Sequence, residues 1–174
     1  VVAAVEAAPA NPVSVEPPHP VAIAEQVLEE RVRQATSLQD LVGDMPVEEA
    51  LSPEMQCLAQ AVYFEARGEP LAGQLAVAKV VMNRATSGLY PTDYCSVVTQ
   101  RKQFSFVRNG HFPSVDESSA AWRKALGITR LAVANAVTSV PTDCLWYHAD
   151  YVAPSWGQRL TRVEKIGAHI FYRS

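Results

Sequence analysis

One carboxylic acid occupies a position where the pattern of the chain calls for an apolar residue. In the stretch CLAQAVYFEARG, Leu58, Ala61 and Val62 follow the i, i+3, i+4 spacing of the buried face of an amphipathic helix. The next position on that face, i+7, is Glu65. Burial disfavours the charged form of a carboxyl and raises its pKa, so a buried Glu65 stays protonated as a general acid requires. Glu65 is therefore the candidate catalytic residue.

A corner between two predicted helices positions this carboxyl. Gly68 predicts a left-handed end for the first helix, and Pro70 suits the first turn of a second helix, where its missing N–H costs little. Apolar residues then resume at helical spacing from Leu71 to Met82. We therefore expect Glu65 in the last turn of the first helix, beside the corner and near a second buried helix.

An ion pair at the surface is the alternative for Glu65. A lone Glu on a helix is more often half-exposed, and Arg67 or Lys79 would be its partner. A series of polar and aromatic residues in predicted loops favours catalysis instead: QFS at 103–105, YHADY at 147–151 and PSW at 154–156. Glycan sites need flat apolar faces for sugar rings and amide or hydroxyl groups for sugar edges. For Phe104 and Trp156, packing in the core is an alternative of equal weight.

Other catalytic chemistries lack their sequence motifs. The chain has no GxSxG, SxxK or HExxH pattern. His148, Asp150 and His169 have the side chains of metal ligands but not a diagnostic spacing, so a structural role is favoured for the histidines and no metal is predicted. Of the three cysteines, Cys57, Cys95 and Cys144, none forms a CxxC pair, and their spacing leaves all three disulfide pairings open.

Composition and charge limit the class of protein. The 174 residues suit one domain plus an appendage, and an apolar fraction of 48% is enough for a core. No apolar run approaches the roughly 18 residues that span a bilayer. Residues 1–50 carry two Lys or Arg against nine Asp or Glu, whereas residues 51–174 carry thirteen against nine. A mildly basic folded part suits an anionic polymer, but no arginine-rich run or nucleic-acid motif is present, so no nucleic-acid partner is predicted.

The first 50 residues are predicted to be an appendage to this domain. Five prolines among the first 20 residues predict an extended tether, residues 21–36 have a helical pattern, and residues 37–50 are predicted as a loop with a short helical turn. The chain starts VVAAVEAAPA without an initiating Met, as a chain does after removal of a signal peptide. We therefore expect an exported protein, although a chain shortened for another reason would look the same.

Residues 51–174 are predicted to form a mainly helical α+β domain. A helix begins at Ser52-Pro53, the two helices of the corner follow, and Thr92 or Asp93 caps a short third helix. Residues 103–112 are predicted as a loop, and residues 119–135 as a further helix. Strand composition at 144–148 and 168–172 predicts two strands that can pair as a small sheet.

Five motifs carry a resemblance to a known family: YFEARGEPLAGQLAVAKVVMNR, YPTDYCSVVTQ, QFSF, YHADYVAPSW and IGAHIFYR. In this order they strongly resemble the SleB-like cell wall hydrolases, a family that includes spore-cortex-lytic-enzyme catalytic domains, over about Cys57 to Arg173. The resemblance implies a compact, lysozyme-like, mostly helical fold that cleaves the glycan backbone of peptidoglycan, preceded here by the Pro-rich tether.

The resemblance also assigns residues. The catalytic Glu of the family falls on Glu65, and Cys57 and Cys95 match family cysteines, which implies their disulfide. Glu69 falls on a motif position at the corner, where helix capping or salt bridging is expected. Motif positions and the aromatic series together give the predicted substrate-binding residues: Gln103, Phe104, Ser105, Tyr147, His148, Tyr151 and Trp156. Relatives often have cysteines beside QFSF that this chain lacks, so its loop is not stapled locally.

These assignments lead to a predicted reaction. Glu65 protonates the glycosidic oxygen between N-acetylmuramic acid and N-acetylglucosamine, and the oxocarbenium-like transition state then needs a second carboxylate or help from the substrate. Asp150 and Glu69 are the only further acidic candidates. A single-acid site favours a lytic transglycosylase, in which Glu65 acts next as a base on the sugar's 6-hydroxyl and leaves a 1,6-anhydro end. No metal or organic cofactor is needed.

Three alternatives remain open from the sequence. The first is hydrolysis by the same Glu65 with water as the acceptor. The second is an amidase that cleaves the stem peptide, which would want zinc or a thiol nucleophile. The third is a peptidoglycan-binding module without activity, against which the cost of burying an unneeded charge argues. In each case we expect a monomer whose partner is the peptidoglycan strand.

Overall fold

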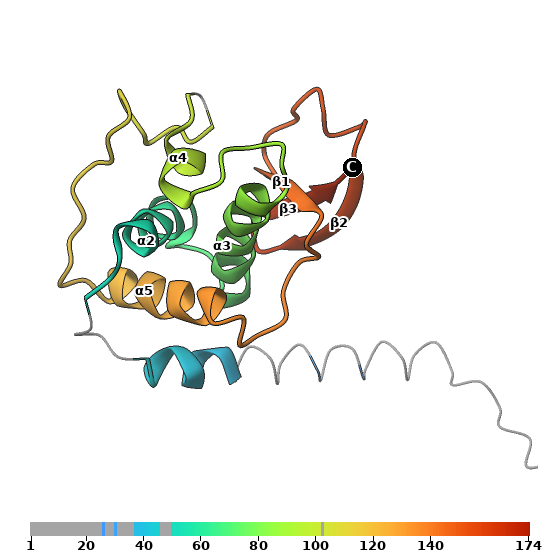
Figure 1. Ribbon diagram of the computed structural model, residues 1–174. Coiled ribbons are helices and arrows are strands. Elements are labelled where there is room, and N and C mark those ends of the chain that lie inside the picture. The colour runs from blue at the N-terminus through green and yellow to red at the C-terminus, as the bar shows by residue number, and fades with distance from the viewer. Residues whose placement is uncertain (1–25, 27–29, 31–36, 46–49, 102) are drawn as a thin grey trace, which may run out of the picture. The chain divides into compact units, whose positions relative to one another are not determined.

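The computed structural model describes residues 26, 30, 37–45, 50–101 and 103–174 (Figure 1). The chain divides into two compact units, Val1–Arg33 and Gln34–Ser174. The predicted Pro-rich tether lies outside the described residues, and so does the predicted helix at 21–36 apart from Gln26 and Glu30. Within the described residues, no helix combines the length and apolar character needed to cross a membrane.

The second unit is mainly helical with one small sheet, as predicted. Its labelled elements are α2 (Pro53–Ala66), α3 (Leu71–Thr86), α4 (Tyr94–Thr99), α5 (Ala120–Val133), β1 (Cys144–Ala149), β2 (Thr161–Ile166) and β3 (His169–Arg173). The three strands form an antiparallel sheet in the order β1-β3-β2. The prediction paired β1 with β3 but missed β2, because TRVEKI is polar and lies mostly at the surface.

Local capping explains where three helices begin. The Ser52 side chain accepts a hydrogen bond from the N–H of Met55 at 3.2 Å, so α2 starts at Pro53 as predicted. Asp93 caps α4 through the N–H of Ser96 at 2.7 Å. Ser119 caps α5 in the same way, through the N–H of Trp122 at 3.1 Å.

The corner between α2 and α3 differs from the prediction in one respect. Gly68 does not have a positive φ, so the predicted left-handed helix end is wrong. Helix α2 ends instead at Ala66, and its C-cap, Arg67, keeps a right-handed conformation and donates its N–H to the carbonyl of Tyr63. The Glu69 carboxylate holds the corner, because its Oε2 accepts the N–H of Ala168 at 3.0 Å in the turn between β2 and β3.

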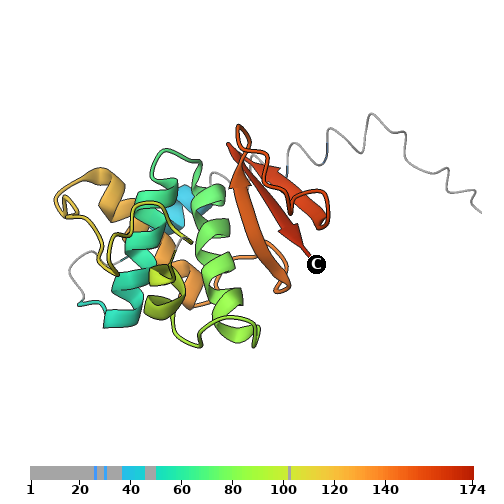
Figure 2. The same cartoon turned by 90° about the horizontal axis from the view of Figure 1, so that it is seen from above.

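Helix α3 lies between two hydrophobic cores. Figure 2 shows it with α2 and α5 on one side and the sheet on the other. Leu75, Ala78 and Val81 belong to the larger core, which α2, α4 and α5 share. Val77 and Val80 belong to the smaller core against the sheet. Because α3 is buried on both sides, it fixes the sheet relative to the other helices.

The folded unit begins earlier than the predicted boundary at residue 51. Residues 37–43 are helical, where a loop with a short turn of helix was predicted, and Leu38 is only 4% exposed in the larger core. A Cβ added to Gly127 of α5 would lie 2.8 Å from Cγ1 of Val42. The apolar side chains of this segment therefore need α5 to cover them, and only the absence of a side chain at Gly127 allows that approach.

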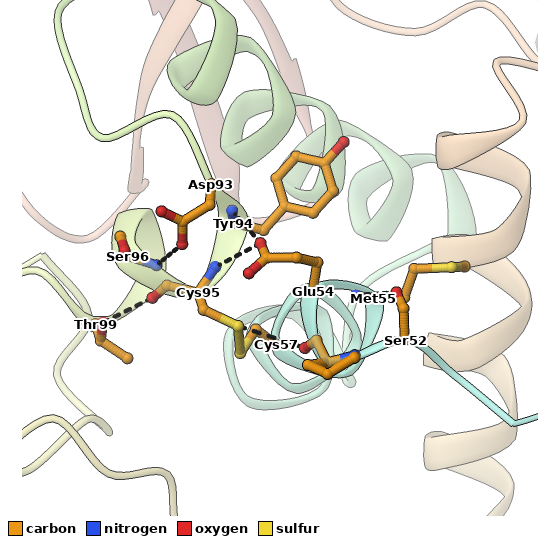
Figure 3. The surroundings of a disulfide bond; sticks show 10 residues. Ser52, Glu54, Met55, Cys57, Asp93, Tyr94, Cys95, Ser96 and Thr99 are labelled. Carbon is orange, nitrogen blue, oxygen red and sulfur yellow. Dashed lines mark hydrogen bonds between the residues drawn. A yellow bond between two sulfur atoms is a disulfide. The ribbon is translucent and has the colours of Figure 1, made fainter.

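A disulfide links the start of α2 to α4, as the resemblance implied. Cys57 and Cys95 form this bond, and Cys144 is a free, buried thiol. Figure 3 shows Glu54 beside the disulfide, with its Oε2 accepting the N–H groups of Tyr94 at 2.6 Å and Cys95 at 3.2 Å. The carboxylate thus satisfies N–H groups at the start of α4 while the disulfide fixes the distance between the helices.

Replacing Gly167 by Ala should destabilise the fold. Gly167 has φ +57°, and an added Cβ would overlap Oε2 of Glu69 and lie 2.9 Å from Cδ of Pro70. Gly88→Ala is the matched control, because Gly88 has φ +78° and open space around it. We expect about 1 kcal/mol of lost unfolding free energy for the control and roughly 1–3 kcal/mol more for Gly167→Ala, measured by urea denaturation. Equal losses would show that the corner does not depend on this contact.

Candidate active site

A cleft of about 620 Å³ gathers all eight predicted site residues. Its walls include Glu65, Gln103, Phe104, Ser105, Tyr147, His148, Tyr151 and Trp156. Six further residues that the prediction did not assign to the site also line it: Phe64, Arg84, Tyr90, Trp146, Ala149 and His169. Among the described residues that line this cleft, Glu65 is the only carboxylate. The cleft therefore brings together the end of α2, the loop after α4 and strand β1.

Glu65 is a half-buried acid with one fixed oxygen. Its Oε2 accepts a hydrogen bond of 3.0 Å from the hydroxyl of Tyr147 on β1. Burial raises the pKa of Glu65, and this effect outweighs the Tyr147 hydrogen bond and the nearby Arg84 charge, which both lower it. A raised pKa favours the protonated form that can deliver a proton, and the Tyr147 bond engages only one of the two carboxyl oxygens.

The surface ion pair considered for Glu65 does not form. Arg67 lies over the ring of Tyr63, with its guanidinium carbon 4.7 Å from the ring centroid. Lys79 is buried on α3, and its Nζ donates to the carbonyl of Ala132 at 3.2 Å and to Oδ1 of Asn135 at 2.8 Å. Both cations thus have other partners, and the catalytic role of Glu65 stays a prediction.

The two other acidic candidates lie outside the cleft lining. Glu69 is engaged with the turn between β2 and β3, an arrangement close to the expected capping but with a partner 99 residues away. Asp150 forms an ion pair with Lys165 at 2.7 Å. Neither carboxylate lines the wall that contains Glu65.

Arg84 is the main site residue that the prediction missed. It is 6% exposed, and its Nε donates to the carbonyl of Leu145 at 2.7 Å while Nη1 donates to Oε1 of Gln103 at 3.3 Å. Its guanidinium carbon also lies 4.8 Å from the centroid of the Tyr90 ring. The sequence held the same signal for Arg84 as for Glu65, a charged residue at a position of an apolar helix face. Arg84 is at i+7 from Val77, as Glu65 is at i+7 from Leu58.

The loop that contains QFSF is held by stacked aromatic rings. Phe106 contacts Phe64 of α2 with ring centroids 5.0 Å apart, and also contacts Phe104 at 5.6 Å and Phe112 at 5.8 Å. Phe104 is only 4% exposed, so the core alternative holds for this ring and a sugar cannot stack on its face. Phe104 therefore supports the cleft floor, and its neighbours Gln103 and Ser105 are exposed.

A second aromatic group closes the other side of the cleft. His148 Nδ1 lies 2.7 Å from the carbonyl of Ala149, so this nitrogen donates, and Nε2 accepts from the hydroxyl of Tyr172 at 2.8 Å. The half-buried Trp156 packs edge-on against His148 and Tyr172. Tyr151 is 86% exposed at the rim. His148 thus organises this wall, while Tyr151 and Trp156 present aromatic surface to the cleft.

His169 lies beside the acid's partner. It is buried on β3 with its ring edge-on to Tyr147, the centroids 5.1 Å apart, and its Nδ1 has no hydrogen-bond partner. Burial lowers the pKa of His169, so the neutral ring is favoured. Across the described part of the chain, no three His, Cys, Asp or Glu side chains are grouped so that they could hold a metal ion.

The fold and the acid in its cleft define a SleB-like catalytic domain. The catalytic domain of the germination-specific lytic transglycosylase SleB from Bacillus anthracis matches with a TM-score of 0.58 and 31% identity, covering 74% of this chain and 100% of that one. The catalytic domain of the Bacillus cereus SleB protein matches with a TM-score of 0.56 and 29% identity, covering 72% and 94%. The predicted fold class is confirmed.

The chain belongs to the cell wall hydrolase family, whose sequence profile matches residues 68–172. The spore cortex-lytic enzyme of Bacillus cereus is 32% identical over 118 residues, and that of Bacillus subtilis strain 168 is 34% identical over 123 residues. Each match covers 68% of this chain, but only 43% and 37% of the two relatives. The chain thus spans less than half the length of these relatives. Glu65 lies just before residue 68, where the match to the family profile begins.

Replacing Glu65 by Gln should change the pH dependence of stability. Because burial raises the folded-state pKa of Glu65, its contribution to stability is present at low pH and is lost as pH rises through that pKa. Gln does not ionise. We therefore expect the unfolding free energy of Glu65→Gln, minus that of the wild type, to be larger at pH 8 than at pH 4. Urea denaturation at both pH values measures this difference.

The control for this measurement makes the same chemical change elsewhere. Glu117 is exposed in the loop before α5, outside the cleft, and Glu117→Gln removes a carboxylate there. An advantage of Glu65→Gln that is the same at pH 4 and pH 8, or that Glu117→Gln reproduces, would contradict a desolvated carboxyl at position 65.

Proposed function

We propose that this protein cleaves the glycan backbone of peptidoglycan between N-acetylmuramic acid and N-acetylglucosamine, as a lytic transglycosylase with Glu65 as its single acid and base. The observation that carries the proposal is the position of Glu65. It is the only carboxylate among the described residues of the cleft, its pKa is raised by burial, and one of its oxygens is held by Tyr147.

The reaction has two proton transfers that use the same carboxyl. Protonated Glu65 first gives its proton to the glycosidic oxygen, the bond from that oxygen to the anomeric carbon breaks, and an oxocarbenium-like centre develops. The Glu65 carboxylate then takes the proton of the sugar's 6-hydroxyl as that oxygen bonds to the anomeric carbon. The product is a 1,6-anhydro sugar, and Glu65 regains its starting protonation without water, metal or cofactor.

The relatives support this choice of outcome. The solved domain from Bacillus anthracis is described as a germination-specific lytic transglycosylase, and it shares 31% of its sequence with this chain over its full length. Hydrolysis by the same acid is the nearest competitor. It needs a group that activates water, and the two other candidate carboxylates, Glu69 and Asp150, are both bound outside the cleft lining.

The remaining residues of the cleft have distinct parts in this proposal. Tyr151 and Trp156 offer aromatic surface on which sugar rings stack. The exposed Gln103 and Ser105 offer hydrogen bonds to sugar edges. Tyr147 orients the acid.

The setting of the reaction is part of the proposal. The Cys57–Cys95 disulfide suits an oxidising compartment, and the substrate lies outside the cytoplasm, so we infer that the chain is exported and acts at the cell wall, in the periplasm where the organism has one. We propose that it acts as a monomer on single glycan strands.

Digestion of purified peptidoglycan by the wild type and by Glu65→Gln tests the proposal directly. We expect anhydro-muropeptides from the wild type and a loss of activity of about 10²–10⁴-fold in the variant, because Gln keeps the shape of Glu but cannot donate the proton. Mass spectrometry identifies the fragments, and initial rates measure the loss. Reducing ends in place of anhydro ends would establish hydrolysis, and nearly full activity of Glu65→Gln would refute the assignment of the acid.

Two control variants test whether a second carboxylate takes part. Glu69→Gln keeps an oxygen that can accept the Ala168 N–H, and Asp150→Asn removes the charge that pairs with Lys165. We expect both to keep their anhydro products and most of their rate. Loss of activity in either, with the fold intact by circular dichroism, would favour a two-carboxylate mechanism.

The amidase and the binding module predict different results in the same assay. A zinc amidase would release free stem peptides and lose activity with EDTA, whereas we expect the activity of this protein to be unchanged by EDTA. A binding module would bind the sacculus and release nothing. Free stem peptides or an absence of fragments would therefore contradict glycan cleavage.

A further inference from the structure

Two side chains of the cleft, Arg84 and Gln103, form a pair that offers mainly hydrogen-bond donors. Arg84 extends from the end of α3 and Gln103 from the loop after α4, and both line the wall that contains Glu65. Nη1 of Arg84 donates to Oε1 of Gln103 at 3.3 Å. Arg84 is almost fully buried, whereas Gln103 is exposed to the cleft.

The contact with Arg84 decides which way the Gln103 amide points. A guanidinium group has five N–H donors and no acceptor, so the amide atom that faces it must be the oxygen. The NH2 group of Gln103 is then left for a ligand. Because Arg84 has no acceptor and one of the two lone pairs of Gln103 Oε1 is already used, this pair offers a substrate more donors than acceptors.

Arg84 itself is held firmly enough to impose this orientation. Its Nε donates to the carbonyl of Leu145 at 2.7 Å, and its guanidinium carbon lies 4.8 Å from the centroid of the Tyr90 ring. Two hydrogen bonds from a planar fork and one stacking contact fix both the position and the plane of the group. Lysine has a single rotatable ammonium and could not hold the Leu145 carbonyl and the Gln103 amide in the same way.

We infer that Gln103, oriented by Arg84, donates its amide N–H groups to a carbonyl oxygen of the substrate and so makes cleavage depend on that carbonyl. This inference rests on the proposed function. A carbonyl oxygen, which only accepts, fits the two N–H donors of this amide, whereas a hydroxyl would also have to share the oxygen that Arg84 already binds. In peptidoglycan such an oxygen belongs either to the acetamido group of a sugar or to the amide that joins the stem peptide to muramic acid.

The test compares three substrates with the wild type and Gln103→Glu. The substrates are intact glycan strands, strands chemically de-N-acetylated, and strands stripped of stem peptides by an amidase. We expect kcat/KM of the wild type to fall roughly tenfold or more on whichever substrate lacks the recognised carbonyl. Gln103→Glu still accepts from Arg84 but repels a carbonyl oxygen. Its kcat/KM on intact strands should therefore fall by a similar factor, with no further fall on the substrate that lacks the recognised carbonyl.

Control variants separate recognition from structure. Gln158→Glu makes the same change at an exposed position outside the cleft and should keep the selectivity of the wild type. Arg84→Lys should also lose selectivity. In the double variant with Gln103→Glu the two losses should not add, because Arg84 acts through Gln103. If Arg84→Lys unfolds, Gln103→Glu alone decides the matter, since it leaves the Arg84 bond to Leu145 untouched.

The outcomes distinguish this inference from the proposed function. Dependence on the acetamido group or on the stem-peptide amide supports the inference and identifies the source of the carbonyl. Cleavage that requires Glu65 but has equal selectivity in the wild type and Gln103→Glu overturns the inference alone. A wild type that cleaves none of the three substrates overturns the proposed function and the inference together.

Discussion

A helix buried on both sides needs partners for its polar side chains, and the side-chain donors of α3 bind the backbone of other segments. Gln74, Lys79, Asn83 and Arg84 are all buried, and each donates a hydrogen bond to a main-chain carbonyl. A buried polar group without a partner costs free energy, so these side chains stabilise the fold only when their partner segments are in place. The partners lie in the corner, at the end of α5, in the loop before β1 and in β1 itself.

The site depends on this arrangement because its parts come from both sides of α3. Glu65 lies in the last turn of α2, which packs on the larger core, whereas Tyr147 comes from the sheet. Their hydrogen bond joins residues 82 apart in sequence. The corner that follows Glu65 is itself tied to the turn between β2 and β3 through Glu69. Acid, orienting hydroxyl and cleft wall are thus set by the same packing that makes the fold stable.

Two ionisable groups of the cleft, Glu65 and Arg84, have different electrostatic roles. Glu65 is only half-buried and gains protonation from the loss of solvent around it. Arg84 is more deeply buried, and three contacts hold its guanidinium group in place. Arg84 lowers the pKa of Glu65, but less than burial raises it, so the net shift favours the protonated form of the acid.

Local interactions determined what the sequence alone could predict. The caps at Ser52 and Asp93 and the acid on the apolar face of α2 each depend on residues within one or two helical turns. The resemblance to the cell wall hydrolases supplied the disulfide and the residues of the cleft, which spacing could not.

Tertiary packing determined the partners of the charged groups and which individual side chains are buried. Arg84 stood out on its helix face as Glu65 did, but its partners, Leu145 and Gln103, are set by segments far along the chain. Packing also buried Phe104, placed residues 37–43 on the core and added the polar strand β2. A periodic pattern predicts that a residue is buried. Only the assembled fold determines which residues it contacts, because those contacts come from distant parts of the chain.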